Sequence, residues 1–272
     1  MGTLCTLGSL GLAALLLGAP AASAATDAEV EACIERNAPE PENVRAVRIT
    51  RRDPRAGSKR IIILKLFGER TPDGSRQLLV RFLEPDDIRG ASILLLERES
   101  GSEVYMASPE LPKPQRIRSS DRTGLLFGTD VSFEDLEWLE GFRVGSALER
   151  QADSKEGLHD VYVVETHPDD SAYSRVISYV DKETCLPLRM DLYGSNGRLR
   201  KEVTTDRRAH VRHGDAWVAH DMLVRDIRDL TSTHFMTDSH QQDVLLPDGL
   251  FTVEGMERAV REDPVVRTGA AP

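Results

Sequence analysis

The chain has 272 residues, of which 40% are hydrophobic and 29% charged. This composition is typical of a folded globular protein, and the length allows one large domain or two small ones. The formal net charge is -10 at pH 7. Because an acidic surface repels phosphate groups, the charge argues against nucleic acid as a partner, and against anionic membrane surfaces unless a local basic patch overrides it.

The first 24 residues have the pattern of an export signal. An apolar run over residues 10–17 precedes the small-residue sequence Ala22-Ser23-Ala24, which is typical of a signal-peptidase site. The run is too short to span a bilayer. We therefore expect a signal peptide over residues 1–24, cleavage near Ala24, and a mature protein in the periplasm.

Two cysteines, Cys33 and Cys185, remain after such a cleavage. In an oxidising compartment two retained cysteines often form a disulfide. A bridge that closes so long a loop would stabilise the fold by about 4 kcal/mol, because it restricts the unfolded chain. The alternative is a pair of unrelated buried thiols.

The N-terminal half of the mature chain changes from a helical to a β pattern. Residues 27–37 have apolar side chains at helical spacing, which predicts a short amphipathic helix. From Val44 onward the period is two, which predicts strands. An Arg-rich stretch over residues 45–60 fits a solvated face of two strands, with a basic binding patch as the alternative. The expected strands here cover residues 44–51, 60–67, 77–83, 91–98 and 103–106.

The middle of the chain interrupts this series of strands. Residues 108–114 contain three prolines, which exclude a central strand. Ser132 and Asp135 have the spacing of a capping box, which predicts a short helix that runs to Leu139 and stops at Gly141.

Strands return in the second half, and the absence of βαβ alternation favours an antiparallel, mainly β fold. A further short helix is expected over residues 254–260. We therefore interpret residues 25–260 as a single domain, followed by a flexible tail over residues 261–272. The expected strands cover residues 144–151, 158–166, 174–180, 186–193, 199–205, 209–213, 217–225 and 231–244.

Patterns that carry chemistry are weak in this sequence. Seven histidines are present, and His210 and His213 are the nearest approach to a metal-binding pair. Side chains three apart on a strand face opposite sides, so we interpret them as surface histidines. The chain has no nucleophile elbow, P-loop or dinucleotide fingerprint. The sequence therefore predicts no catalytic residue, no metal and no cofactor, and a protein that is not an enzyme.

The few short helices leave open what covers the inner face of so large a sheet. They could cover a curved sheet incompletely and leave an apolar cleft, which is a favoured place for a ligand. Periodicity alone favours the other reading, an ordinary packed core.

Four stretches of sequence resemble a known family, the LolA-like outer-membrane lipoprotein-sorting proteins. LEPDDIRGASIL (residues 83–94) resembles the family's strand connection P-x-D-I-x-G-T-x-L, although Ala91 replaces the usual Thr. The sequence from VYM to QRI (residues 104–117) resembles M-Y-L-P…R-R-I. FGTDVSFEDL (residues 127–136) is close to F-x-G-T-D-F-S-Y-E-D-L and is the most specific match. PDGLFT (residues 247–252) resembles the closing L-P-x-x-L-F-T.

The resemblance implies an incomplete antiparallel β-barrel, that is, a strongly curved sheet with a few short helices forming a lid over an apolar cavity. It reverses the preference for a packed core and makes the helix that follows Ser132 part of the lid. The resemblance also implies that ten residues contact lipid. They are Phe82, Ile88, Leu94, Leu96, Met106, Leu126, Phe127, Phe133, Leu136 and Trp138.

The function implied by the resemblance is that of a periplasmic carrier. It would bind lipid or lipoprotein acyl chains for transport between the inner and outer membranes. The resemblance also implies a transporter of the resistance-nodulation-division (RND) type as a partner. The alternative is a periplasmic adaptor or envelope-stress sensor that binds a protein partner.

Overall fold

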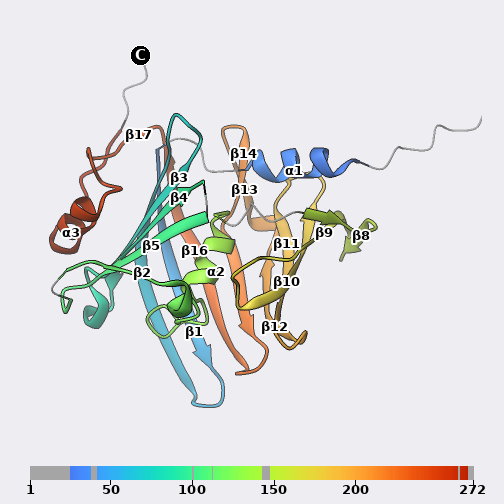
Figure 1. Ribbon diagram of the computed structural model, residues 1–272, viewed down its shortest axis with the longest axis horizontal. Helices are drawn as coiled ribbons and strands as arrows, with labels where there is room; N and C mark the ends of the chain where they lie inside the picture. Colours follow the sequence, from blue (N-terminus) through green and yellow to red (C-terminus); the bar gives the residue numbers. More distant parts are fainter. Residues whose placement is uncertain are drawn as a thin grey trace, which may run out of the picture.

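A strongly curved antiparallel sheet organises the molecule, as Figure 1 shows in this computed structural model. The structure describes residues 25–37, 42–99, 101–111, 113–142, 148–262 and 264–268. The expected signal peptide and its cleavage site lie outside these residues.

The strands of the large sheet come from both halves of the chain. The first half contributes β1 (Asn43–Asp53), β2 (Ser58–Arg70), β3 (Arg76–Glu84), β4 (Ser92–Arg98), β5 (Gly101–Ala107) and β6 (Gln115–Arg116). The second half contributes β7 (Leu148–Arg150), β8 (Ser154–Glu156), β9 (His159–Thr166), β10 (Tyr173–Asp181), β11 (Pro187–Gly194), β12 (Leu199–Thr205), β15 (Asp221–Asp226) and β16 (Thr231–Gln242).

Within the described residues this sheet has 14 strands in the order β6-β5-β4-β3-β2-β1-β16-β15-β12-β11-β10-β9-β7, with β8 also paired to β9. The two halves join where β1 pairs with β16, and a register shift between Ala46 and Val47 marks this junction. A bulge of this kind bends a strand and increases its twist. The sheet ends at β6 and β7, so it is curved but not closed.

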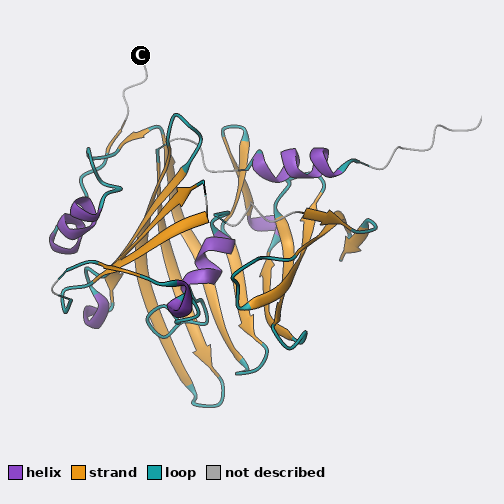
Figure 2. Cartoon of the chain, viewed as in Figure 1, coloured by secondary structure: helices purple, strands orange, loops and turns teal. Residues whose placement is uncertain are grey.

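The remaining elements are short (Figure 2). The hairpin of β13 (His210–His213) and β14 (Ala216–Ala219) forms a small sheet of its own, as do β17 (Val244–Leu245) and β18 (Arg267–Thr268). The helices are α1 (Asp27–Glu35), α2 (Phe133–Leu139) and α3 (Val253–Arg261), with 3-10 turns at Asp86–Ile88, Ser119–Asp121 and Arg207–Ala209.

The period of two along each strand sends alternate side chains to opposite faces of the sheet. On β4, Ile93 and Leu95 belong to the core cluster on the concave face, where α2 packs. Leu94 and Leu96 belong to a second cluster together with Met256 of α3, which lies on the outer side of the sheet (Figure 1). Both faces of β3 and β4 are therefore buried.

The predicted mainly β fold is confirmed, and one of the predicted strands needs correction. The strand expected over residues 217–225 is divided into β14 and β15, because the chain bends at His220. Part of the expected flexible tail is β18, which pairs with β17, while Val266 packs against the outer cluster.

Candidate functional site

The concave face of the sheet holds two neighbouring cavities. A small one of about 70 Å³ lies beneath α2, against β1, β2, β3 and β16. A larger one of about 300 Å³ lies over the second half of the sheet, under α1 and the β13–β14 hairpin. We call the larger one the chamber. Its volume is at the lower end of the range of about 300–1,000 Å³ that is usual for ligand sites.

Apolar side chains from several strands form the floor of the chamber. Val164, Val180 and Val203 are buried, and they come from β9, β10 and β12 respectively. Leu148 of β7, Met190 of β11 and Met222 of β15 continue this surface. The floor is therefore largely apolar, although Thr166, Ser178, Arg189 and Thr205 also line the chamber.

The roof of the chamber consists of α1 and the β13–β14 hairpin. The helix begins with a capping box, in which Thr26 and Glu29 bond to each other's backbone N–H groups. A disulfide joins Cys33 to Cys185, and their Cα atoms lie 5.3 Å apart. Next to it, Asn37 donates to the Thr184 carbonyl at 2.5 Å.

The same Asn37 also holds the hairpin, because its side-chain oxygen accepts the backbone N–H of Trp217 at 2.7 Å. All four residues of β14 line the chamber. The C-terminal end of α1 thus connects the two parts of the roof, while Val30 of the same helix packs on Val164 and Val180 of the floor.

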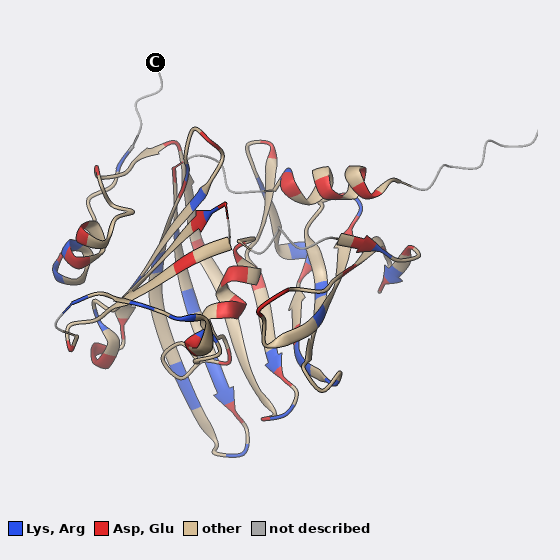
Figure 3. Cartoon of the chain, viewed as in Figure 1, with Lys and Arg blue, Asp and Glu red and all other residues tan. Residues whose placement is uncertain are grey.

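An ion pair separates the two cavities. Arg45 of β1 and Glu140, which follows α2, bond to each other and line both spaces. Their side chains retain 15% and 13% of their exposure. Figure 3 shows basic residues along β1 and β2, and the sequence suggested that this stretch is solvated. That interpretation is wrong for Arg45, because its position on β1 gives it the inward direction of Val47 and Ile49.

Comparisons with known proteins agree with this architecture. A protein-family model described as "uncharacterized protein" matches residues 74–258. The chain belongs to that family. No curated protein matches the chain.

Solved structures with the same fold come from several bacteria. A domain named as an outer membrane lipoprotein-sorting protein from Vibrio parahaemolyticus is 21% identical, with a TM-score of 0.76 over 84% of this chain and 96% of its own. A DUF1329 family protein from Desulfovibrio piger gives the same four values. A LolA superfamily protein from Nitrosomonas europaea is 18% identical, with a TM-score of 0.67 over 84% of this chain and 98% of its own. The fold is therefore LolA-like.

The LolA-like signature over residues 127–136 is built mainly of structural contacts. Gly128 has a φ of 77°, which favours glycine. Thr129 donates to the Leu126 carbonyl at 2.8 Å. The carboxylate of Asp130 accepts from the hydroxyl groups of Thr231 and Thr233 on β16. The loop is thereby fixed to the middle of the sheet.

Three buried carboxylates anchor α2 itself. Asp135 accepts from Tyr173 Oη at 2.5 Å and from Lys201 Nζ, and burial together with this carboxylate raises the pKa of Tyr173. Glu134 accepts the backbone N–H of Ala172 at 3.1 Å. Glu137, with its side chain fully buried, pairs with Arg122 at 2.9 Å. Such a helix is a fixed part of the cover.

The structure separates the ten residues predicted to contact lipid into three groups. Phe82, Leu126 and Leu136 line the small cavity, and Trp138 lines the chamber. Four others belong to or pack against the concave core without lining either space, namely Ile88, Met106, Phe127 and Phe133. The last two, Leu94 and Leu96, lie in the outer cluster under α3, on the opposite face of the sheet.

Most of the chamber is made of residues that the sequence analysis did not select. Val164, Val180, Met190 and Val203 lie in the second half, outside the best motif matches. A signal was present, since each of these strands has alternating apolar residues. This alternation could not distinguish the hollow side from the packed side, because a strand that is buried on both faces has apolar side chains on each of them.

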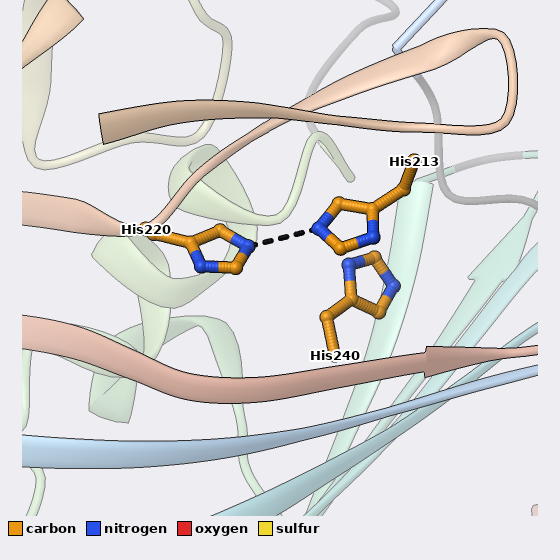
Figure 4. A group of neighbouring side chains, drawn as sticks. All are labelled: His213, His220 and His240. Atoms are coloured by element: carbon orange, nitrogen blue, oxygen red, sulfur yellow. Dashed lines mark hydrogen bonds between the residues drawn. The ribbon is translucent and has the colours of Figure 1, made fainter. Parts of the chain in front are cut away.

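Three histidines meet beside the chamber (Figure 4). His213 ends β13, His220 follows β14, and His240 lies on β16 and lines the chamber. Burial lowers the pKa of His213, and burial, His213 and Arg45 lower that of His220. Burial, with Arg45 nearby, lowers the pKa of His240 to about 3.

The interpretation of His210 and His213 as surface histidines is wrong for His210, which is buried. His210 lies between two hydroxyl groups, with Nδ1 3.0 Å from Thr184 Oγ1 and Nε2 2.9 Å from Thr205 Oγ1. It is therefore a buried structural residue, and His213 turns toward the other two histidines instead.

Proposed function

We propose that this protein is a periplasmic carrier that binds the acyl chain of a lipid or lipoprotein in the chamber. The observation that carries the proposal is an apolar space of about 300 Å³ between a curved sheet and a roof of separate elements. The LolA-like fold supports the same class of ligand.

The walls of the chamber suit a molecule that is apolar over most of its length. Each methylene group buried there would contribute about 0.8 kcal/mol, so an acyl chain needs few polar contacts. One polar contact is available, because Trp138 lines the chamber and its buried Nε1 has no hydrogen-bond partner among the described residues. We propose that this N–H donates to an oxygen at the polar end of the acyl chain.

The proposed compartment rests on two features. The disulfide between Cys33 and Cys185 suits an oxidising environment, and the first 24 residues have the pattern of an export signal. None of the helices within the described residues is long and apolar enough to cross a membrane. Exchange of the ligand with an RND-type transporter is a further part of the proposal, and it rests on the family resemblance.

The proposal is tested by filling the chamber. Val203→Phe places a ring where a buried valine lines the space, and Val265→Phe makes the same change at a valine that is 69% exposed. We expect native mass spectrometry of protein purified from a periplasm to detect bound lipid in the wild type and in Val265→Phe. In Val203→Phe we expect bound lipid to be lost and the affinity for a fluorescent fatty acid to fall at least about tenfold.

Absence of co-purified lipid from the wild type, together with no binding of the fluorescent fatty acid, would contradict the proposal. Equal fatty-acid affinity in Val203→Phe and the wild type would place the ligand elsewhere and contradict the assignment of the chamber. Circular dichroism spectra of both variants confirm that they fold.

A further inference from the structure

The histidines beside the chamber form a compact group of nitrogen ligands. One ring nitrogen from each of His213, His220 and His240 lies within 4.8 Å of the others. The Nε2 atoms of His213 and His220 are 3.0 Å apart, and the ring centroids of His213 and His240 are 4.2 Å apart. Figure 4 shows the three rings turned toward one another from three different segments.

These distances are close to those of a metal site. Two imidazole nitrogens bound to one tetrahedral Zn²⁺ at about 2.0–2.1 Å lie about 3.3 Å from each other. The contact between His213 and His220 is near this value, and rotation of the His240 ring would bring the third nitrogen into range. The group thus needs only small side-chain movements to enclose an ion.

His240 supplies an independent reason to look for a ligand. Both of its ring nitrogens are buried, and neither has a hydrogen-bond partner among the described residues. A buried polar group without a partner costs about 1–3 kcal/mol, so native proteins seldom keep one without a use. A metal ion would give this imidazole the partner that it lacks.

We propose that His213, His220 and His240 together bind one divalent transition-metal ion, with Zn²⁺ as the ion that fits best. Imidazole ligands suit Zn²⁺, Cu²⁺ and Ni²⁺, whereas Ca²⁺ and Mg²⁺ prefer oxygen ligands. Three protein ligands leave the fourth position of a tetrahedral ion for water or for a ligand atom. Because His240 lines the chamber, that position is accessible from the chamber.

The charges around the group allow this assignment. Arg45 is the nearby cation that acts on His220 and His240, and it would oppose a bound cation. Its charge is balanced by Glu140, to which it is hydrogen-bonded. The positive ion would thus enter a site at which the nearby cation, Arg45, already has a carboxylate partner.

A bound ion would also fix one wall of the chamber. The β13–β14 hairpin forms a sheet of its own, and its second strand lines the chamber. His213 lies at the turn end of that hairpin, where it pairs with Ala216, while His220 directly follows the hairpin and His240 belongs to the large sheet. The ion would therefore link the hairpin to β16 and fix the distance between the roof and the sheet.

The test uses the full mature chain, purified without a histidine tag and freed of metal with a chelator. Titration with ZnCl₂ in a calorimeter measures stoichiometry and affinity, and CoCl₂ reports tetrahedral coordination through its visible absorption. We expect one ion per chain. His240→Ala and His213→Ala should each weaken Zn²⁺ binding by at least about 100-fold and abolish the cobalt spectrum, since each removes a direct ligand.

A matched control separates this site from surface histidines. His167→Ala removes an imidazole that is 53% exposed and pairs with Glu165, so we expect Zn²⁺ affinity within about twofold of the wild type. We expect Zn²⁺ to raise the unfolding temperature of the wild type and of His167→Ala, and to leave that of His240→Ala unchanged.

The site is refuted if metal-free wild type binds no Zn²⁺, or if His240→Ala binds it as tightly as the wild type does. If either alanine variant fails to fold, His220→Ala is read by the same criteria. None of these outcomes depends on lipid binding, so failure here leaves the proposed carrier function to its own test.

Discussion

The two halves of the concave face have different interiors although they belong to one sheet. Over β1, β2 and β3, α2 packs directly on the strands and leaves about 70 Å³. Over β9 to β12, the cover contacts the strands where Val30 of α1 packs on Val164 and Val180, and the space beside this contact is about 300 Å³. The small cavity is lined mainly by aliphatic and aromatic side chains, whereas the chamber combines such side chains with charged ones that include Glu31, Arg76 and Arg189.

The attachment of the cover also differs between the two halves. In the packed half, α2 is held through its own middle, where three buried carboxylates bond to neighbouring segments. In the hollow half, α1 packs on Val164 and Val180 through Val30, and its C-terminal end is held by the disulfide and by Asn37, which also bonds to the hairpin. The cover there contacts the sheet at α1 and leaves the chamber beside that contact.

The largest expected effect tests the anchoring of α2. Asp135→Ala leaves Lys201 buried without its partner, since the side chains of both are 4% exposed. Removing one member of a buried ion pair costs about 3–5 kcal/mol. We expect the free energy of unfolding, measured with denaturant, to fall by this amount.

The matched change at the border between the cavities is Glu140→Ala, whose partner Arg45 is less deeply buried. We expect a loss of less than half as much free energy of unfolding. Equal losses of the free energy of unfolding in Asp135→Ala and Glu140→Ala would contradict the comparison. They would show that α2 is held no more firmly than the ion pair between the two cavities.

An intermediate effect tests the difference in packing between the halves. Val104 is fully buried in the concave core and lines neither cavity, whereas Val203 lines the chamber. Overpacking a filled core costs about 1–3 kcal/mol. We expect that cost in Val104→Phe and less than about 1 kcal/mol in Val203→Phe, since the ring enters an existing space. Similar losses of thermal stability in both would mean that the chamber is not open.

The smallest effect concerns acid. Burial and the neighbouring Arg207 lower the pKa of His210 to about 4, whereas a histidine in the unfolded chain has a pKa of about 6.5. Between these values the unfolded chain binds a proton that the folded chain does not bind. The free energy of unfolding should therefore be highest above pH 6.5 and fall as the pH decreases toward 4.

His210→Asn removes this titrating group and should flatten the fall in stability between pH 6.5 and 4. His167→Ala, which removes an exposed histidine, should retain the wild-type slope. Denaturant unfolding at several pH values measures both. An unchanged slope in His210→Asn would assign the acid sensitivity to other groups.

Sequence reasoning reached the fold through local patterns. The capping box at Ser132 and Asp135 is present, with the Asp135 N–H bonded to Ser132 Oγ at 3.1 Å. The alternating strands and the disulfide are present as well. The capping box and the strands depend on residues close in sequence. The disulfide pairing was almost fixed, because only two cysteines remain after cleavage of the expected signal peptide.

The site was predicted less well, for physical reasons that particular residues make clear. Ile93, Leu94, Leu95 and Leu96 are all buried, so the alternation that distinguishes an inner from an outer face is lost in this strand. Leu94 and Leu96 were accordingly assigned to the cavity although they lie under α3. Arg45 was assigned to a solvated face because of its charge, although it lines both cavities.

The sequence alone determined an acidic, mainly β chain with a capped central helix, an export-like N-terminus and two cysteines able to pair. Only the tertiary structure decided which half of the sheet is hollow and which histidines meet. Both depend on contacts between distant segments, such as Cys33 with Cys185 across 152 residues and His213 with His240 across the roof. Local periodicity carries no information about such contacts, because it reports the direction of a side chain and not what stands opposite to it.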